Sequence, residues 1–114
     1  MNFIDILIIV QFAGAACAYM LLGFIWGAGF VLLEHWRPGS FVIPSGYLNA
    51  PGLDLVATLT YFSFVTLTTL GYGVIHPADA ATGGLCVAEA IVGQLFLAVT
   101  VARMVGLYAA QRHD

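Results

Sequence analysis

The hydrophobic positions of the chain fall into three long apolar stretches separated by more polar breaks. The first covers residues 6–33, and a helix of that length is roughly 42 Å long at 1.5 Å per residue. It is long enough to cross a bilayer with some tilt. The segment 34–39 carries charges, a Trp and a Pro-Gly pair, all typical of a membrane interface. We therefore predict a spanning helix over residues 6–33 and a loop over residues 34–52.

The second apolar stretch predicts a helix that is too short to cross. Residues 53–67 suit a helix, because Pro51 fits its first turn and Asp54 lies near the positive end of the helix dipole. That helix is roughly 22 Å long, which is less than a bilayer needs. Residues 68–74 hold two glycines and lack a helical pattern, so we predict an extended segment there. Such backbone is tolerated at membrane depth only beside protein or a water-filled pathway, which predicts a re-entrant element.

The third stretch predicts a second spanning helix over residues 77–108, with Pro77 at its start and Asp79 in its first turn. The first helix is interpreted as a retained span and not a signal peptide, since no Lys or Arg precedes it and Asp5 stands where a signal peptide has positive charge. The fold class is therefore an all-α membrane protein. A single domain over residues 1–114 accounts for the whole pattern.

Composition and charge place the chain in lipid and orient it. It is 61% hydrophobic and only 8% charged, more apolar surface than a soluble domain of 114 residues can hide. Arg103 and Arg112 lie towards the end of the last helix, against a single Arg37 in the middle loop. The positive-inside rule therefore puts both termini in the cytoplasm, and we expect the cell membrane as the location. The net charge of -3, without a basic cluster, gives no reason to expect a nucleic-acid partner.

One short motif carries the candidate chemistry, Thr69-Leu70-Gly71-Tyr72-Gly73. A cation that leaves water needs its hydration shell replaced, and stacked rings of backbone carbonyls can do this for potassium. The carbonyls face one axis only if the backbone alternates between right- and left-handed states, which Gly71 and Gly73 permit. Potassium ions would then lie at Thr69, Leu70, Gly71 and Tyr72, with the Thr69 hydroxyl adding an oxygen. Leu70 and Tyr72 would point backward into the packing around the short helix, whose C-terminus directs negative partial charge towards the axis.

With this motif between a half-span helix and two flanking spans, the chain resembles the two-transmembrane potassium channels of prokaryotes and some viruses. The resemblance covers essentially the whole chain. It implies an outer helix (6–33), a turret loop (34–52), a pore helix (53–67), a filter (68–74) and an inner helix (77–108). It also implies a fourfold homotetramer around the pore axis, because one filter loop cannot encircle an ion.

The sequence departs from the family pattern at three positions near the motif. Leu70 stands where Val or Ile is usual, Val74 where Asp is often found, and Val65 where some members carry Glu. The acid pair that braces the filter in those relatives is therefore missing. Two other functions stay open: a weakly selective cation channel and a non-conducting membrane protein that assists another complex. We expect no enzyme activity and no cofactor besides permeant potassium, since the sequence lacks Ser-His-Asp, Cys-His or metal-ligand spacing.

The last helix carries further candidate residues. By resemblance Gly93 is a hinge, although a packing glycine fits equally well. Helical spacing places four residues on one face that would line a cavity and an apolar gate: Gln94, Leu97, Val101 and Val105.

Glu89 is costly within a membrane helix and calls for a partner. It lies about 140° from Gln94 on the helical wheel and should face the short helix. We predict that it supports the filter through a hydrogen bond to Thr66, Thr68 or Tyr61, the alternative being an interfacial Glu that reaches water. Arg103 lies too far along the helix to pair with it.

Overall fold

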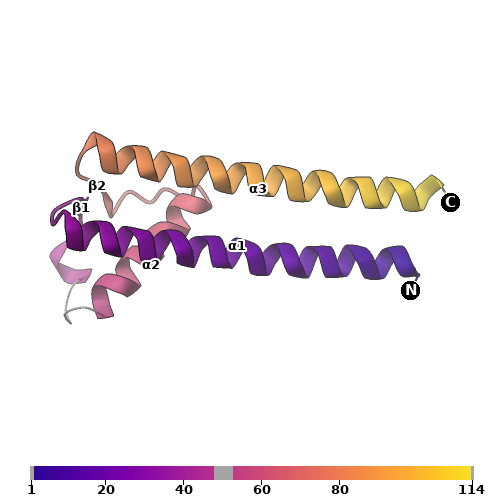
Figure 1. The fold of residues 1–114 in the computed structure, drawn as a ribbon, viewed down its shortest axis with the longest axis horizontal. Helices are drawn as coiled ribbons and strands as arrows, with labels where there is room; N and C mark the ends of the chain where they lie inside the picture. The colour runs from indigo at the N-terminus through magenta and orange to yellow at the C-terminus, as the bar shows by residue number, and fades with distance from the viewer. Residues whose placement is uncertain (1, 48–52, 114) are drawn as a thin grey trace.

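The computed structural model describes residues 2–47 and 53–113. Its helices are α1 (Phe3–Trp36), α2 (Leu53–Leu67) and α3 (Ala80–His113). Three short elements connect them: β1 (Phe41–Val42), the 3-10 turn η1 (Ser45–Tyr47) and β2 (His76–Pro77). Figure 1 shows α1 and α3 side by side along the long axis of the molecule, with α2 slanting across one end of the pair.

Two of the helices are long and apolar enough to cross a membrane, and α2 is not. The two candidate spans are Phe3–Trp36 and Ala80–Ala110, whereas α2 has only 15 residues. Both termini lie at the same end of the molecule, as two spans require (Figure 1). The predicted all-α membrane fold, with two spans and a short helix between them, is confirmed.

The first helix extends beyond its predicted bounds of 6–33 at both ends. A capping box starts it at Phe3, because the Asn2 side chain accepts from the Asp5 N–H and the Asp5 carboxylate accepts from the Asn2 N–H. It ends at Trp36, after which the Arg37 N–H still bonds the Leu33 carbonyl at 2.8 Å. The helix thus uses local caps that the apolar pattern does not reveal.

The predicted start of the last helix at Pro77 is wrong. Pro77 belongs to β2, which pairs antiparallel with β1 opposite Phe41. The helix begins at Ala80 because the Asp79 carboxylate accepts from the Thr82 N–H at 2.8 Å and so caps the first turn. The helix continues to His113, past the predicted end at residue 108.

Three aromatic rings from three elements form the centre of the core. Phe30 on α1, Phe41 on β1 and Phe62 on α2 are buried, and their ring centroids lie 5.2 to 5.6 Å apart. Phe41 shows that part of the predicted turret loop packs on its own chain. The Glu34 carboxylate fixes that loop by accepting from the Gly39 and Phe41 N–H groups.

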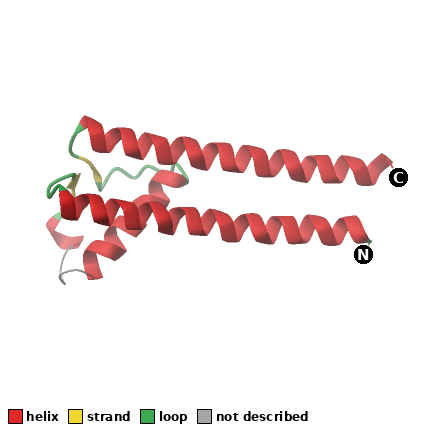
Figure 2. Ribbon diagram, in the orientation of Figure 1, coloured by secondary structure: helices red, strands yellow, loops and turns green. Residues whose placement is uncertain are grey.

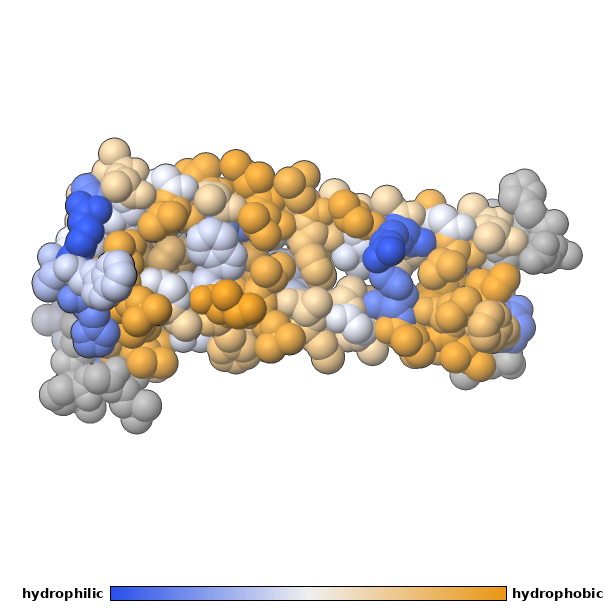
Figure 3. Space-filling model, in the orientation of Figure 1, coloured by the Kyte–Doolittle hydropathy of each residue, from blue (hydrophilic) through white to orange (hydrophobic). Residues whose placement is uncertain are grey.

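The molecule divides along its length into two halves. The three-helix half comprises residues 23–93, and every buried residue among the described side chains lies in it. The two-helix half comprises residues 3–22 of α1 and 94–113 of α3, which extend past the end of α2; at its edge Tyr19 still reaches Leu67, the last residue of α2. Figure 2 shows the irregular segment after α2 running back towards the strands. The visible face is mostly apolar, with hydrophilic residues at the end that holds the strands and at one spot between the two long helices (Figure 3).

Candidate functional site

The candidate filter, residues 69–73, begins directly at the C-terminal cap of α2. The Leu70 N–H donates to the Val65 carbonyl at 2.9 Å, and the Thr69 N–H donates to the Thr66 carbonyl at 3.1 Å. This pair of bonds is a Schellman motif, which needs a left-handed residue at its turn. Thr69 fills that place with a φ of +57°, uncommon for a β-branched side chain. The helix end therefore fixes the conformation of the first residue of the candidate filter.

The backbone of the candidate filter alternates in handedness. Gly71 has a φ of +66° and Gly73 a φ of +80°, while the intervening Leu70 and Tyr72 stay at negative φ. With Thr69, every second residue is left-handed, so successive carbonyls can turn towards one side of the chain. The alternation expected from the two glycines is present, and it extends to Thr69, whose residue type does not predict a positive φ.

The backbone groups of residues 71–74 make no hydrogen bond within the described part of the chain. The side chains of Leu70 and Tyr72 are 54% and 65% exposed, so packing against α2 by the same chain is incomplete. The prediction that these two side chains point into packing is thus only partly met, because one chain supplies a single wall. Unpaired backbone at membrane depth is costly unless protein or water covers it.

The carbonyls that end α2 are already hydrogen-bonded. The Thr68 N–H and its hydroxyl both donate to the Phe64 carbonyl, and the Tyr19 hydroxyl donates to the Leu67 carbonyl at 3.2 Å. The Thr69 hydroxyl donates to the Thr68 carbonyl at 2.6 Å. Such orphan carbonyls need partners at a helix end. The Tyr19 bond also ties the end of α2 to α1 at mid-depth.

Gly93 permits α3 to approach that same helix end. A Cβ at position 93 would lie 2.6 Å from the Leu67 carbonyl oxygen and 2.8 Å from its Cδ1. The first is a backbone atom and cannot yield cheaply. Of the two readings of Gly93, this geometry supports the packing glycine and not the hinge. On α1, Gly27 is similar, since a Cβ there would lie 3.1 Å from the Thr60 Cα.

Glu89 is fully buried and faces α2, as its position on the helical wheel predicts. Its partner is Ser63, whose hydroxyl lies 2.6 Å from the Glu89 Oε2 and 2.7 Å from the Gly23 carbonyl oxygen. The three predicted partners Thr66, Thr68 and Tyr61 are wrong.

The correct partner follows from how the helices cross. α2 and α3 meet where Gly93 contacts Leu67, and one turn back along both helices places Glu89 beside Ser63. The result is a three-helix link, Gly23–Ser63–Glu89, one helical turn before the contact of Leu67 with Gly93. Its other oxygen, Oε1, has no hydrogen-bond partner among the described residues.

The ion channel family matches residues 6–109, nearly the whole length of the chain. The chain belongs to the ion channel family. No curated protein and no solved structure matches it. The match confirms the resemblance to two-transmembrane channels at the level of the family and supports ion conduction across a membrane.

Val65 and Val74 stand at the two positions where the expected acid pair is missing, and both line one small pocket. It is enclosed between α2 and the returning segment, and its other lining residues are Tyr61, Phe62, Tyr72, Gly73 and Ile75. Carboxylates at 65 and 74 would therefore share one space behind the candidate filter. In this channel the space is lined by apolar and aromatic side chains, so Glu89 and Ser63 supply the polar link from a different side of α2.

The predicted cavity face of α3 is open on the single chain. Leu97, Val101 and Val105 are 42%, 57% and 60% exposed. Gln94, at the top of this face, places its Nε2 3.5 Å from the Thr69 hydroxyl. The face therefore continues directly below the inner end of the candidate filter.

Sequence reasoning missed Ser63 and Tyr19, both of which hold α2 in place. A Tyr in the middle of an apolar helix is a usable signal, since a buried hydroxyl usually finds a partner. Ser63 carries no such signal, because its place beside Glu89 depends on the contact of Leu67 with Gly93, which only the structure shows. No group of three or more His, Cys, Asp or Glu that could hold a metal occurs in the described ranges.

Proposed function

We propose that this channel-family protein forms a potassium-selective passive pore as a fourfold homotetramer, with residues 69–73 as its filter. The observation that carries the proposal is the alternating handedness of these residues, +57° at Thr69, +66° at Gly71 and +80° at Gly73. A strand that alternates in this way turns its carbonyls towards one side, as a carbonyl-lined cation filter requires. The order Thr-Leu-Gly-Tyr-Gly is the basis for choosing potassium among the cations.

In this proposal the permeant ions are held by oxygens of the backbone. Potassium binds at the carbonyls of Thr69, Leu70, Gly71 and Tyr72, and no other cofactor takes part. The Thr69 hydroxyl keeps a lone pair for an ion at the inner end, since its proton is donated to the Thr68 carbonyl.

What one chain leaves open supports the fourfold assembly. The backbone of residues 71–74 makes no hydrogen bond to other described residues, and Leu70 and Tyr72 are more than half exposed. Four copies around an axis would cover these side chains and close the ring of carbonyls. The two termini share one end, and the positive-inside rule, applied to Arg103 and Arg112, supports a cytoplasmic location for that end.

The proposed gate is the apolar face of α3 below Gln94. Leu97, Val101 and Val105 from four chains would form a constriction that closes by dewetting. Because Gly93 is packed against Leu67, we place any opening motion below it, in the two-helix half.

A weakly selective cation channel is the second candidate. It is favoured by the pocket around Val65 and Val74, which lacks charged side chains and leaves the back of the filter without an acid brace. The two candidates share the pore and differ only in how well it rejects sodium.

The test is reconstitution of the purified full chain in liposomes and planar bilayers, with reversal potentials measured under potassium and sodium gradients. A potassium-selective pore gives a reversal potential near the potassium equilibrium value and is blocked by barium. A reversal near zero in opposing gradients supports the weakly selective channel. Absence of any flux supports the accessory protein and contradicts both.

Two matched glycines sharpen this test. Gly73 has a φ of +80° and Gly39 a φ of +85°, and neither has an atom near its missing Cβ. Alanine therefore introduces similar backbone strain at both positions. We expect Gly73→Ala to abolish selectivity or conduction and Gly39→Ala to leave both unchanged. If Gly73→Ala keeps the reversal potentials of the wild type, residues 69–73 are not the filter.

A further inference from the structure

An open groove lies between α1 and α3, mostly in the two-helix half; of its lining residues only Ile25 and Val92 belong to the three-helix half. Its volume is about 790 Å³. Small residues of α1 (Gly14, Ala15 and Ala18) open it, and nothing lies within 4 Å of the missing Cβ of Gly14. Phe96 lines the groove, and its ring also contacts Tyr19 at a centroid distance of 5.7 Å, which bounds the groove on the side of α2.

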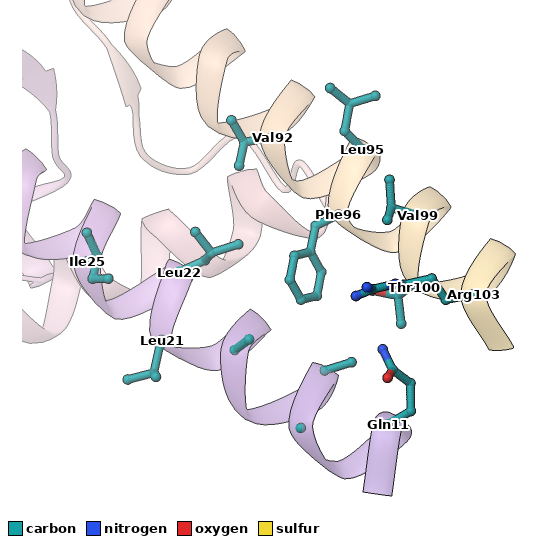
Figure 4. A pocket seen from close by; sticks show the side chains of 13 residues that line it. Gln11, Leu21, Leu22, Ile25, Val92, Leu95, Phe96, Val99, Thr100 and Arg103 are labelled. Atoms are coloured by element: carbon teal, nitrogen blue, oxygen red, sulfur yellow. The ribbon is translucent and has the colours of Figure 1, made fainter. Parts of the chain in front are cut away.

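The groove is apolar along most of its length and polar at one place. Its only lining residues with polar side chains are Gln11, Thr100 and Arg103. Figure 4 shows the Gln11 amide pointing from α1 towards Thr100 and Arg103 on α3. The groove is thus amphipathic, with one cationic side chain at the end of a long apolar stretch.

Arg103 makes no ion pair and no hydrogen bond among the described residues. The ion pair of Arg37 with Asp79 lies at the opposite end of the molecule. Arg103 lies ten residues before the end of α3, roughly 15 Å along the helix. A cation at such a position in a span is costly and normally faces a cavity and a counter-ion.

We propose that this groove binds one anionic phospholipid, with its phosphate on Arg103 and Gln11 and an acyl chain along the groove towards Phe96. Charge complementarity selects this occupant, because basic sites between membrane helices bind anionic headgroups. A second copy of the chain is less suited. Of the described carboxylates only Asp5 lies in this half, and it is engaged in the α1 cap. The proposal goes beyond ion conduction and does not depend on which ion passes.

Native mass spectrometry of the purified full chain in detergent, titrated with phosphatidylglycerol or phosphatidylcholine, tests the site. We expect preferential binding of phosphatidylglycerol. Because Arg103→Gln removes a charge-assisted hydrogen bond, it should weaken that binding about tenfold or more. Arg112→Gln removes the same charge from the same end and should change it less than about twofold. Ala18→Trp fills the apolar part of the groove and should also abolish binding. Glycerol phosphate, which has no acyl chain, should not bind.

Three results would overturn the proposal. Equal loss in Arg103→Gln and Arg112→Gln would mean general attraction to surface charge. If Arg103→Gln binds phosphatidylglycerol as tightly as the wild type, Arg103 does not hold the phosphate. This variant also keeps the test valid if Ala18→Trp does not fold. If the wild type carries no lipid, and Arg103→Gln and Ala18→Trp both weaken the oligomer in lipid-free detergent, the groove is a contact between copies. None of these results bears on the filter, which is tested by reversal potentials.

Discussion

The three-helix half and the two-helix half contain the same two long helices but differ in what holds them together. In the first, glycines at 27 and 93 admit neighbouring helices to close contact, and hydrogen bonds from Tyr19, at its edge, and Ser63 cross between elements. In the second, α1 and α3 are separated by a groove of about 790 Å³. In lipid there is no hydrophobic force between helices, so close packing and hydrogen bonds must hold them together. Both occur where α2 is present, which makes α2 the element that joins the spans.

The largest expected effect is that of an added methyl group at Gly93. Gly93→Ala would place a Cβ 2.6 Å from the Leu67 carbonyl oxygen, so α2 and α3 must separate. Overpacking of this kind costs about 3 kcal/mol. The control Gly106→Ala, in the two-helix half of the same helix, meets nothing within 4 Å and should be neutral or slightly stabilising. Denaturant unfolding in detergent measures both, and equal stabilities would contradict the difference between the halves.

A smaller loss is expected when the Gly23–Ser63–Glu89 link is broken. Ser63→Ala leaves the Glu89 carboxyl and the Gly23 carbonyl without their shared partner, which costs about 2 kcal/mol. Glu89→Gln can still accept the Ser63 bond and should conduct normally, whereas Glu89→Ala should damage the filter.

The double variant Ser63→Ala with Glu89→Ala checks that the two residues act together. Its loss of unfolding free energy should be less than the sum of the two single losses. Additive losses, or equal and normal currents from Glu89→Gln and Glu89→Ala, would show that the link does not support the filter.

Removal of one hydroxyl at the edge of the three-helix half should have a modest effect. Tyr19→Phe loses the 3.2 Å bond to the Leu67 carbonyl, worth about 1 kcal/mol, but keeps the ring contact with Phe96. Tyr61→Phe, which removes a hydroxyl that makes no hydrogen bond among the described residues, is the comparison. The midpoint of thermal unfolding should fall more for Tyr19→Phe, and the reverse order would count against a role for Tyr19 in holding α2.

The smallest effect is expected at the exposed ion pair that joins the two spans at the strand end. The Thr82 N–H, with help from the Arg37 guanidinium, holds the pKa of the Asp79 carboxyl below its ordinary value. A lowered pKa stabilises the fold above the ordinary Asp pKa of about 4 and loses that contribution as the pH falls through the folded value. Unfolding midpoints should therefore fall more steeply with acid in the wild type than in Asp79→Asn. Parallel curves would mean that the charge of Asp79 contributes nothing to the stability of the fold.

The helices and the short re-entrant element could be predicted from the sequence because hydropathy and length decide them. α2 occupies the predicted residues 53–67. The left-handed Gly71 and Gly73 were also predictable, since glycine has no Cβ penalty there. The start of α3 could not be predicted, because the helix cap at Asp79 competes with the preference of Pro77 for the first turn of a helix.

Contacts between helices were the part that the sequence could not specify. The partner of Glu89 depends on the level at which α2 crosses α3, which is set by Gly93 against Leu67. Wheel geometry gives the direction of a side chain but not the height of its neighbour. The positive φ of Thr69 likewise arises from the cap of α2 and not from its residue type.

The open backbone of residues 71–74 also has a consequence for the newly made subunit. Each uncovered polar group in hydrocarbon costs several kcal/mol, so a solitary chain in the bilayer is a high-energy species. For the homotetramer proposed above, the lifetime of the solitary chain is limited by how quickly it encounters other copies, and so by the rate of synthesis per area of membrane. Slow expression would lengthen the interval in which proteases and insertion machinery meet the unassembled form.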